Sequence, residues 1–257
     1  SAGVESPLLD NETGARVRTH GERFAAWLNG NVPGGIVPSA AVGVVQGDQL
    51  IFHHGVRADS TTRFGIASLS KTFTAVLALR LQEKKVLSLD DPVTKHLPGV
   101  VIEREELHSS PVTVRHLLAH TSGIPSYGSN HTVHDLGGRR LSLPRQVHPA
   151  GYCYSYSNEG YEVLMHIIEA ATGVSYAENM REHVFVPLGM SSSTAEHANG
   201  TGGIVSTIQD LARYAGMLNQ RGVYRDRVIL SEKSFSEMMA RPVELPNARV
   251  DYYYSLS

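Results

Sequence analysis

Two side chains in the first third of the chain have the types and spacing that acyl transfer requires. Ser68 and Lys71 form the only Ser-x-x-Lys pattern in the 257 residues, at the start of an apolar segment. Residues three apart share one face of a helix, so the hydroxyl and the amine can lie within hydrogen-bond distance. A serine hydroxyl becomes an effective nucleophile when a neighbouring base accepts its proton. The alternative is an ordinary helix start with a serine cap and a solvated lysine.

A second pair of polar side chains follows downstream. Tyr156 and Asn158 form the only Tyr-x-Asn pattern, directly before a helical segment. A nearby ammonium favours the phenolate form of a tyrosine, which can take the serine proton and later pass it to a leaving group. The asparagine amide offers both a donor and an acceptor, which suits contact with a substrate amide. The alternative is a tyrosine-rich turn before a helix.

The elements that must position these four residues are helices and a short sheet. Apolar periodicity predicts helices over residues 12–28, from Ser68 onward, and over 113–120, 158–171, 176–184, 207–218 and 231–239. Two valine-rich segments, 40–46 and 50–54, flank a Gly-Asp turn and predict a β-hairpin. The helix from Ser68 would place free backbone N–H groups beside the hydroxyl. Its apolar stripe contains Phe73, Val76, Leu77 and Leu81. The pattern favours an α+β fold.

Composition limits the classes of function. The chain has 23 basic and 25 acidic residues, a balance that argues against a nucleic-acid or membrane-surface partner. No apolar run approaches the length of a membrane span. The single cysteine, Cys153, excludes an internal disulfide and is interpreted as a packing residue. We expect no cofactor, because glycine-rich phosphate loops, Gly-x-Ser-x-Gly and His-Glu-x-x-His are all absent.

Other polar candidates have simpler interpretations. His131, His134 and Asp135 lie in a segment rich in glycine, proline and histidine that spans residues 126–151. Without a further pair of ligands, we interpret them as polar loop residues and predict no metal site. Asp210 stands in the first turn of a predicted helix, where a negative charge is favourable, and is not assigned to chemistry.

Taken together, the motifs resemble the serine β-lactamase and penicillin-binding protein superfamily, on the branch of class C β-lactamases, D-amino-acid peptidases and related esterases. The matching segments are Phe-Gly-Ile-Ala-Ser-Leu-Ser-Lys-Thr-Phe-Thr at 64–74, Leu-Leu-Ala-His-Thr-Ser-Gly at 117–123, Tyr-Ser-Asn-Glu-Gly-Tyr at 156–161, Pro-Leu-Gly-Met at 187–190 and Gly-Gly-Ile-Val-Ser-Thr-Ile-Gln-Asp-Leu at 202–211. The resemblance implies an acyl-enzyme on Ser68, with Lys71 and Tyr156 as the proton-handling pair and Asn158 as a substrate contact. A tyrosine in place of the serine of Ser-x-Asn sets the chain apart from class A enzymes.

The resemblance also implies a β-lactamase/transpeptidase-like architecture, with an antiparallel sheet flanked by helices and an all-helical subdomain. We expect one catalytic domain over residues 1–257, incomplete at its C-terminal side. Residues 12–62 would form the N-terminal helix and hairpin of the α/β part, 63–200 the mainly helical part, and 201–257 the return to the α/β part. A periplasmic or extracellular location is implied by the family.

One family motif does not appear after Asn158, namely Lys-Thr-Gly or His-Thr-Gly on a strand that donates an oxyanion N–H. His-Thr-Ser-Gly at 120–123 is not this motif, because it has an extra serine and precedes Tyr156. We therefore expect the active protein to have further residues beyond Ser257 that carry the motif. They would belong to the same chain or to a cleaved companion fragment.

The function implied by the resemblance is that of a serine acyl-transfer hydrolase with a small-molecule or peptide substrate. The expected reaction is cleavage of an amide bond, in a short or D-amino-acid-containing peptide or in a β-lactam. Two alternatives stay open, a carboxylesterase of the same family and a non-catalytic penicillin-binding or sensor-like module.

Overall fold

The computed structural model describes residues 11–32, 37–98, 100, 102, 111–126, 134–135, 141–142 and 146–240. Its contacts divide the chain into two compact units. The first unit comprises Ser1–Gly65, Phe185–Thr194 and Val205–Ser231. The second unit comprises Ile66–Val184, Ala195–Ile204 and Glu232–Ser257. The part boundaries predicted from the sequence at residues 63 and 201 stay predictions.

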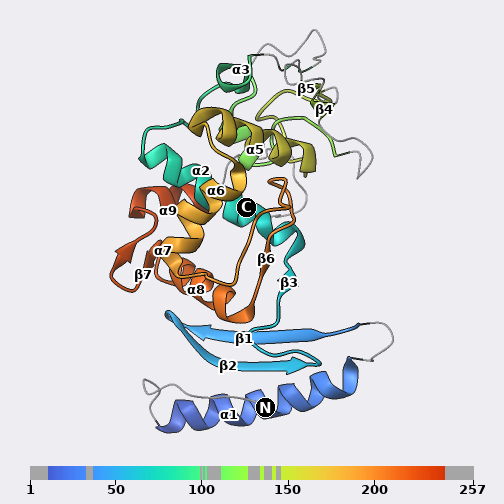
Figure 1. Ribbon diagram of the computed structural model, residues 1–257, viewed down its shortest axis with the longest axis vertical. Helices are drawn as coiled ribbons and strands as arrows, with labels where there is room; N and C mark the ends of the chain where they lie inside the picture. Colours follow the sequence, from blue (N-terminus) through green and yellow to red (C-terminus); the bar gives the residue numbers. More distant parts are fainter. Residues whose placement is uncertain are drawn as a thin grey trace. The chain divides into compact units, whose positions relative to one another are not determined.

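A hairpin packed between two helices forms the centre of the first unit (Figure 1). Strand β1 (Ala40–Gln46) pairs antiparallel with β2 (Gln49–Val56), as the valine-rich segments and the Gly-Asp turn predicted. Helix α1 (Asn11–Asn31) packs on β2, and helix α8 (Ile208–Asn219) contacts both strands. The sequence therefore predicted the hairpin and both helices correctly.

The start of α8 also fixes a neighbouring segment of the first unit. The Thr207 side chain caps the helix by accepting the Asp210 backbone N–H at 3.2 Å. The buried Asp210 carboxylate accepts hydrogen bonds from the Ser192 N–H and the Ser193 hydroxyl, both at 2.8 Å, and pairs with Arg213. Asp210 is thus a helix-start charge, as predicted, and in addition a tether for residues 192–193.

The remaining elements of the first unit are short. Strand β3 (Phe64–Gly65) pairs antiparallel with β6 (Val205–Ser206). Strand β7 (Val223–Tyr224) pairs antiparallel with β8 (Arg227–Val228), and helix α7 is Val186–Leu188.

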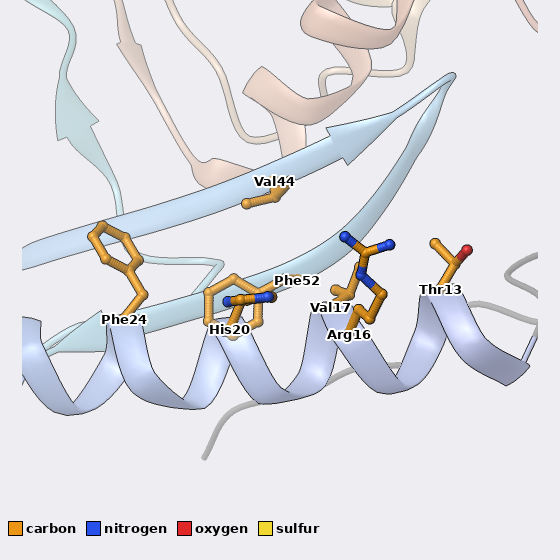
Figure 2. Close-up of a pocket in the computed structure, with 8 residues that line it drawn as sticks. Thr13, Arg16, Val17, His20, Phe24, Val44 and Phe52 are labelled. Atoms are coloured by element: carbon orange, nitrogen blue, oxygen red, sulfur yellow. The ribbon is translucent and has the colours of Figure 1, made fainter.

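A groove runs along α1 where that helix faces the hairpin (Figure 2). It is lined by Thr13, Arg16, Val17, His20, Gly21, Phe24, Val44 and Phe52. Phe24 and Val44 are exposed there, so part of the apolar surface of this unit stays accessible to solvent.

Helix α2 (Ser70–Glu83) is the core of the second unit and contacts α5 (Asn158–Thr172), α6 (Tyr176–Met180) and α9 (Glu232–Met239) (Figure 1). The sequence predicted one apolar stripe on α2. Instead, consecutive residues are buried all around the helix: Phe73, Thr74, Ala75, Val76, Leu77, Ala78 and Leu79. A helix surrounded by other helices buries every face, so a stripe pattern underestimates its burial.

The other elements of the second unit are short, and the sequence predicted one of them, the helix expected over residues 113–120. They are the 3-10 turn η1 (Ala67–Leu69), the helices α3 (Val93–His96) and α4 (Val114–Leu118), and the strand pair β4 (His134–Asp135) and β5 (Leu141–Ser142). The helix predicted over 176–184 ends as α6 at Met180, and the π-helix η2 (Arg181–Phe185) continues it. None of the helices within the described residues has the length and apolar character needed to cross a membrane.

Two glycines with the same backbone conformation allow a controlled test of the second unit. Gly123 and Gly173 both have φ of 76°, in the left-handed region. A Cβ atom at Gly173 would meet open space, whereas one at Gly123 would collide with the His148 carbonyl oxygen. We expect Gly173→Ala to lower the free energy of unfolding by about 1 kcal/mol, from the backbone strain alone.

We expect Gly123→Ala to cost about 1–3 kcal/mol more than that, because the backbone of residues 146–148 must move. Denaturant unfolding of both variants measures the difference. Equal losses in the two variants would contradict the close approach of these backbones.

Candidate active site

Ser68 is the middle residue of η1, two residues before α2 begins at Ser70. This corrects the sequence prediction, which placed Ser68 at the α-helix N-terminus itself. In a 3-10 turn, residues three apart eclipse one another, so the spacing to Lys71 still aligns the two side chains. The preceding residue, Ala67, has φ of 47°, a region that costs energy for a residue with a Cβ atom. Such strain is a feature of many functional sites.

Lys71 is buried beneath the serine, with 2% of its surface exposed. Its Nζ donates hydrogen bonds to the Ser68 Oγ at 3.3 Å and to the Thr201 carbonyl oxygen at 2.8 Å. The same ammonium lies 4.8 Å from the centroid of the Tyr156 ring. A charge this deeply buried needs such partners, because desolvation alone would make it very costly.

Tyr156 completes the arrangement from the other side. Its hydroxyl donates a hydrogen bond to the Ser68 Oγ at 3.0 Å, and 40% of its surface is exposed. The structure therefore brings together Ser68, Lys71 and Tyr156, which the sequence had selected by residue type and spacing. Either neighbour can receive the serine proton when it is itself deprotonated. The arrangement provides a nucleophile with two adjacent proton carriers.

Asn158 is the first residue of α5, two positions after Tyr156. The Ser157 side chain caps this helix by accepting the Gly160 N–H at 2.9 Å, and the Asn158 backbone N–H donates to the Ser126 Oγ at 3.3 Å. The capping serine thus fixes where Tyr156 leaves the turn and where Asn158 enters the helix.

Comparison with known proteins agrees with this geometry. A family model described as Beta-lactamase matches residues 24–254. The chain belongs to the beta-lactamase family. The family match and the solved structures below confirm the predicted fold class.

The chain is 34% identical over 168 residues to penicillin-binding protein 4* of Bacillus subtilis, an alignment that covers 58% of this chain and 36% of the relative. It is 28% identical to a beta-lactamase from Mycobacterium bovis, with a TM-score of 0.62 over 86% of this chain and 66% of that one. A D-stereospecific amidohydrolase from Streptomyces has the same fold, at 23% identity and a TM-score of 0.65 over 84% and 77% of the two chains. The chain spans about a third of the length of the curated relatives it matches.

The sequence analysis did not identify the turn at residues 199–202 as a partner of the Lys71 ammonium. The Asn199 side-chain oxygen accepts hydrogen bonds from the N–H and hydroxyl of Thr201, at 3.3 and 3.1 Å, and from the Gly202 N–H at 3.2 Å. This turn presents the Thr201 carbonyl to Lys71, while the Gly200 carbonyl accepts the Thr74 hydroxyl at 2.8 Å. The only signal in the sequence was the Gly-Thr-Gly-Gly run, which predicts a turn but not its partner.

His120 is a further neighbour of the site that the sequence analysis did not identify. It is buried, and its ring stacks on that of Tyr156 with centroids 4.5 Å apart. Burial, with a contribution from the Lys71 charge, lowers the pKa of His120 from 6.5 to about 3. The imidazole is therefore neutral at neutral pH.

The remaining candidates have no demonstrated link to this chemistry. Burial raises the pKa of the Cys153 thiol, which disfavours the thiolate. His134 and Asp135 form the short strand β4, whereas His131 lies outside the described residues. The Lys-Thr-Gly or His-Thr-Gly strand predicted beyond Ser257 also lies outside them and stays a prediction.

The lowered pKa of His120 predicts how stability depends on pH. A histidine that protonates less readily when folded contributes stability that is complete above its unfolded pKa near 6.5 and is lost as the pH falls toward 3. We expect the free energy of unfolding to drop by about 2–3 kcal/mol from this residue between pH 7 and pH 4.5. Denaturant titrations at several pH values measure the drop.

The matched variant is His120→Asn, which cannot titrate in this range and isolates the contribution of His120 from that of other histidines. His116 and His183 also have pKa values lowered first by burial, so they add a drop in the same direction. An unchanged pH dependence in the variant would show that His120 is not buried as described.

Proposed function

We propose that the chain is a serine acyl-transfer hydrolase that forms an acyl-enzyme on Ser68. One observation carries the proposal: the Ser68 Oγ accepts hydrogen bonds from both the Lys71 ammonium and the Tyr156 hydroxyl. A structural serine needs no such pair, whereas nucleophilic catalysis needs a proton acceptor in contact with the hydroxyl. Membership of the beta-lactamase family supports the same conclusion.

The proposed reaction starts from the form of the site in which the Tyr156 hydroxyl has released its proton to solvent, leaving a phenolate beside the Lys71 ammonium. The phenolate then takes the Ser68 proton, so that the pair formed by Tyr156 and Lys71 holds it. The Oγ attacks the substrate carbonyl carbon, and the tetrahedral intermediate collapses when the C–N bond breaks. The leaving nitrogen takes up the proton held by the pair. In the second half, the same pair takes a proton from water, which attacks the ester and releases Ser68 with its proton restored.

The proposed substrate class is an amide, in a short or D-amino-acid-containing peptide or in a β-lactam. The names of the relatives support this class, since they include a penicillin-binding protein, a beta-lactamase and a D-stereospecific amidohydrolase. Asn158 is the proposed substrate contact. Its position two residues after Tyr156 at the start of α5 supports this role, and an amide side chain can both donate to and accept from a peptide group.

The proposal predicts the outcome of covalent labelling with a fluorescent penicillin. We expect Ser68→Ala to remove the label completely, because the bond forms on its Oγ. We expect Lys71→Met, which keeps the volume but removes the amine, to lower the labelling rate about a hundredfold or more. Intact-mass measurement and peptide mapping locate the label.

Thr72→Ala is the matched control, since its hydroxyl lies next to Lys71 in sequence and bonds only to the Leu69 carbonyl. It should label at close to the wild-type rate. Label that persists in Ser68→Ala, or that maps to another residue, would refute the assignment. Hydrolysis of a matched amide and ester then separates the peptidase or β-lactamase reading from the esterase alternative.

A further inference from the structure

Both backbone N–H groups that flank Tyr156 are held by one residue, His120. The Ser155 N–H donates to the His120 carbonyl oxygen at 2.7 Å, and the Ser157 N–H donates to the His120 ring Nδ1 at 3.0 Å. The Tyr156 side chain leaves the backbone between these two bonds. Hydrogen bonds at the preceding and the following residue therefore fix the backbone from which the Tyr156 side chain projects.

The imidazole also supports the Tyr156 ring directly. The His120 and Tyr156 ring planes are 29° apart, with centroids at 4.5 Å, in a stacked arrangement. Tyr161 packs against His120 with centroids at 4.9 Å, and its own hydroxyl is fixed by donating to the Leu118 carbonyl at 2.9 Å. Such ring contacts have preferred geometries and so restrict rotation of the phenol.

The backbone of His120 is itself held in an unfavourable conformation. Its φ is 56°, in the left-handed region, where a residue with a Cβ atom costs energy. The conformation follows the end of α4 and directs both the carbonyl and the ring toward residues 155–157. Strain of this kind persists only where the surrounding contacts impose it.

The hydrogen bond from Ser157 also fixes the protonation state of the ring. A nitrogen that accepts an N–H cannot carry a proton, so the neutral His120 has its proton on Nε2. A protonated ring would lose this acceptor and place a second positive charge beside Lys71. The lowered pKa of His120 agrees with a permanently neutral ring.

We propose that His120 is a positioning residue, which acts through its Nδ1 acceptor and its flat ring to hold the Tyr156 hydroxyl on the Ser68 Oγ. This inference rests on the proposed function of Tyr156 as a proton carrier. We call the Ser157–His120 hydrogen bond and the stacked rings of His120 and Tyr156 the clamp. Without it the phenol would be misplaced, and displacements of about 1 Å can lower a rate on the order of a hundredfold. The residue touches neither substrate nor nucleophile in this role.

Two variants test the hydrogen-bond acceptor and the flat ring of His120 separately. His120→Phe keeps a flat ring but has no acceptor, whereas His120→Asn keeps an acceptor oxygen near the position of Nδ1 but has no ring. Amide hydrogen exchange, measured by NMR, reports on the clamp without any activity. We expect Ser157 to exchange about five- to tenfold faster in His120→Phe and near the wild-type rate in His120→Asn. Ser155 is an internal control, since its bond is to the backbone carbonyl.

The same variants are then labelled with the fluorescent penicillin over a range of concentrations. We expect His120→Phe to lower the limiting first-order labelling rate about ten- to a hundredfold, with little change in the half-saturating concentration. His120→Asn should recover part of this loss. Asn179→Ala is the control for stability, because this buried side chain on α6 donates hydrogen bonds to Thr172, Val174 and Ser175, at the end of α5 and in the turn that follows it. It should melt earlier but keep the limiting rate.

A wild-type limiting rate in His120→Phe, together with faster exchange at Ser157, would overturn the positioning role. Loss of rate in Asn179→Ala to the same extent as in His120→Phe would overturn it too, since general destabilisation would then explain both. A wild-type chain that takes no penicillin label and hydrolyses neither the amide nor the ester substrate refutes the proposed function itself, and exchange at Ser157 then decides the clamp alone.

Discussion

The candidate site depends on a positive charge held inside the second unit. The Lys71 ammonium is buried, and desolvation of such a group costs several kcal/mol unless its protons find acceptors. The Thr201 carbonyl and the Ser68 Oγ supply two of these acceptors, and the face of the Tyr156 ring lies close by. The same contacts that make the charge tolerable place it against the serine. The contacts that stabilise the buried Lys71 charge are therefore also the contacts that the proposed chemistry needs.

This geometry is imposed by segments with irregular backbones rather than by regular helices. Ala67 and His120 both have left-handed φ values, although neither is a glycine. Ala67 precedes Ser68, and His120 holds the turn that carries Tyr156. Ala67 is exposed, whereas His120 is buried and packs against the rings of Tyr156 and Tyr161. Contacts in the folded chain can hold residues at left-handed φ values that an isolated peptide would rarely adopt.

The two units place different demands on their sequences. In the first unit, the hairpin has α1 and α8 on its two faces, so successive residues such as Ile51 and Phe52 are both buried, while the groove along α1 stays open to solvent (Figures 1 and 2). In the second unit, α2 contacts α5, α6 and α9, and every residue from Phe73 to Leu79 is buried. The residues proposed for catalysis all belong to the second unit. Two of its buried polar side chains, Lys71 and His120, lie at the site, and each is close to the Tyr156 ring.

The sequence by itself predicted the longer helices, the hairpin and the candidate residues. Local rules suffice for these, because periodicity, capping residues and turn glycines act within one or two turns of the chain, as at Ser157 and Gly173 around α5. The short spacings of Ser68 to Lys71 and of Tyr156 to Asn158 were equally visible. The tertiary structure decided which residues that are far apart in the sequence contact one another. It joined Lys71 to the Thr201 carbonyl and Ser157 to His120, and it placed Ser68 in a 3-10 turn. A carbonyl or an imidazole becomes part of a site only when folding brings it within hydrogen-bond distance, and no local pattern records that distance.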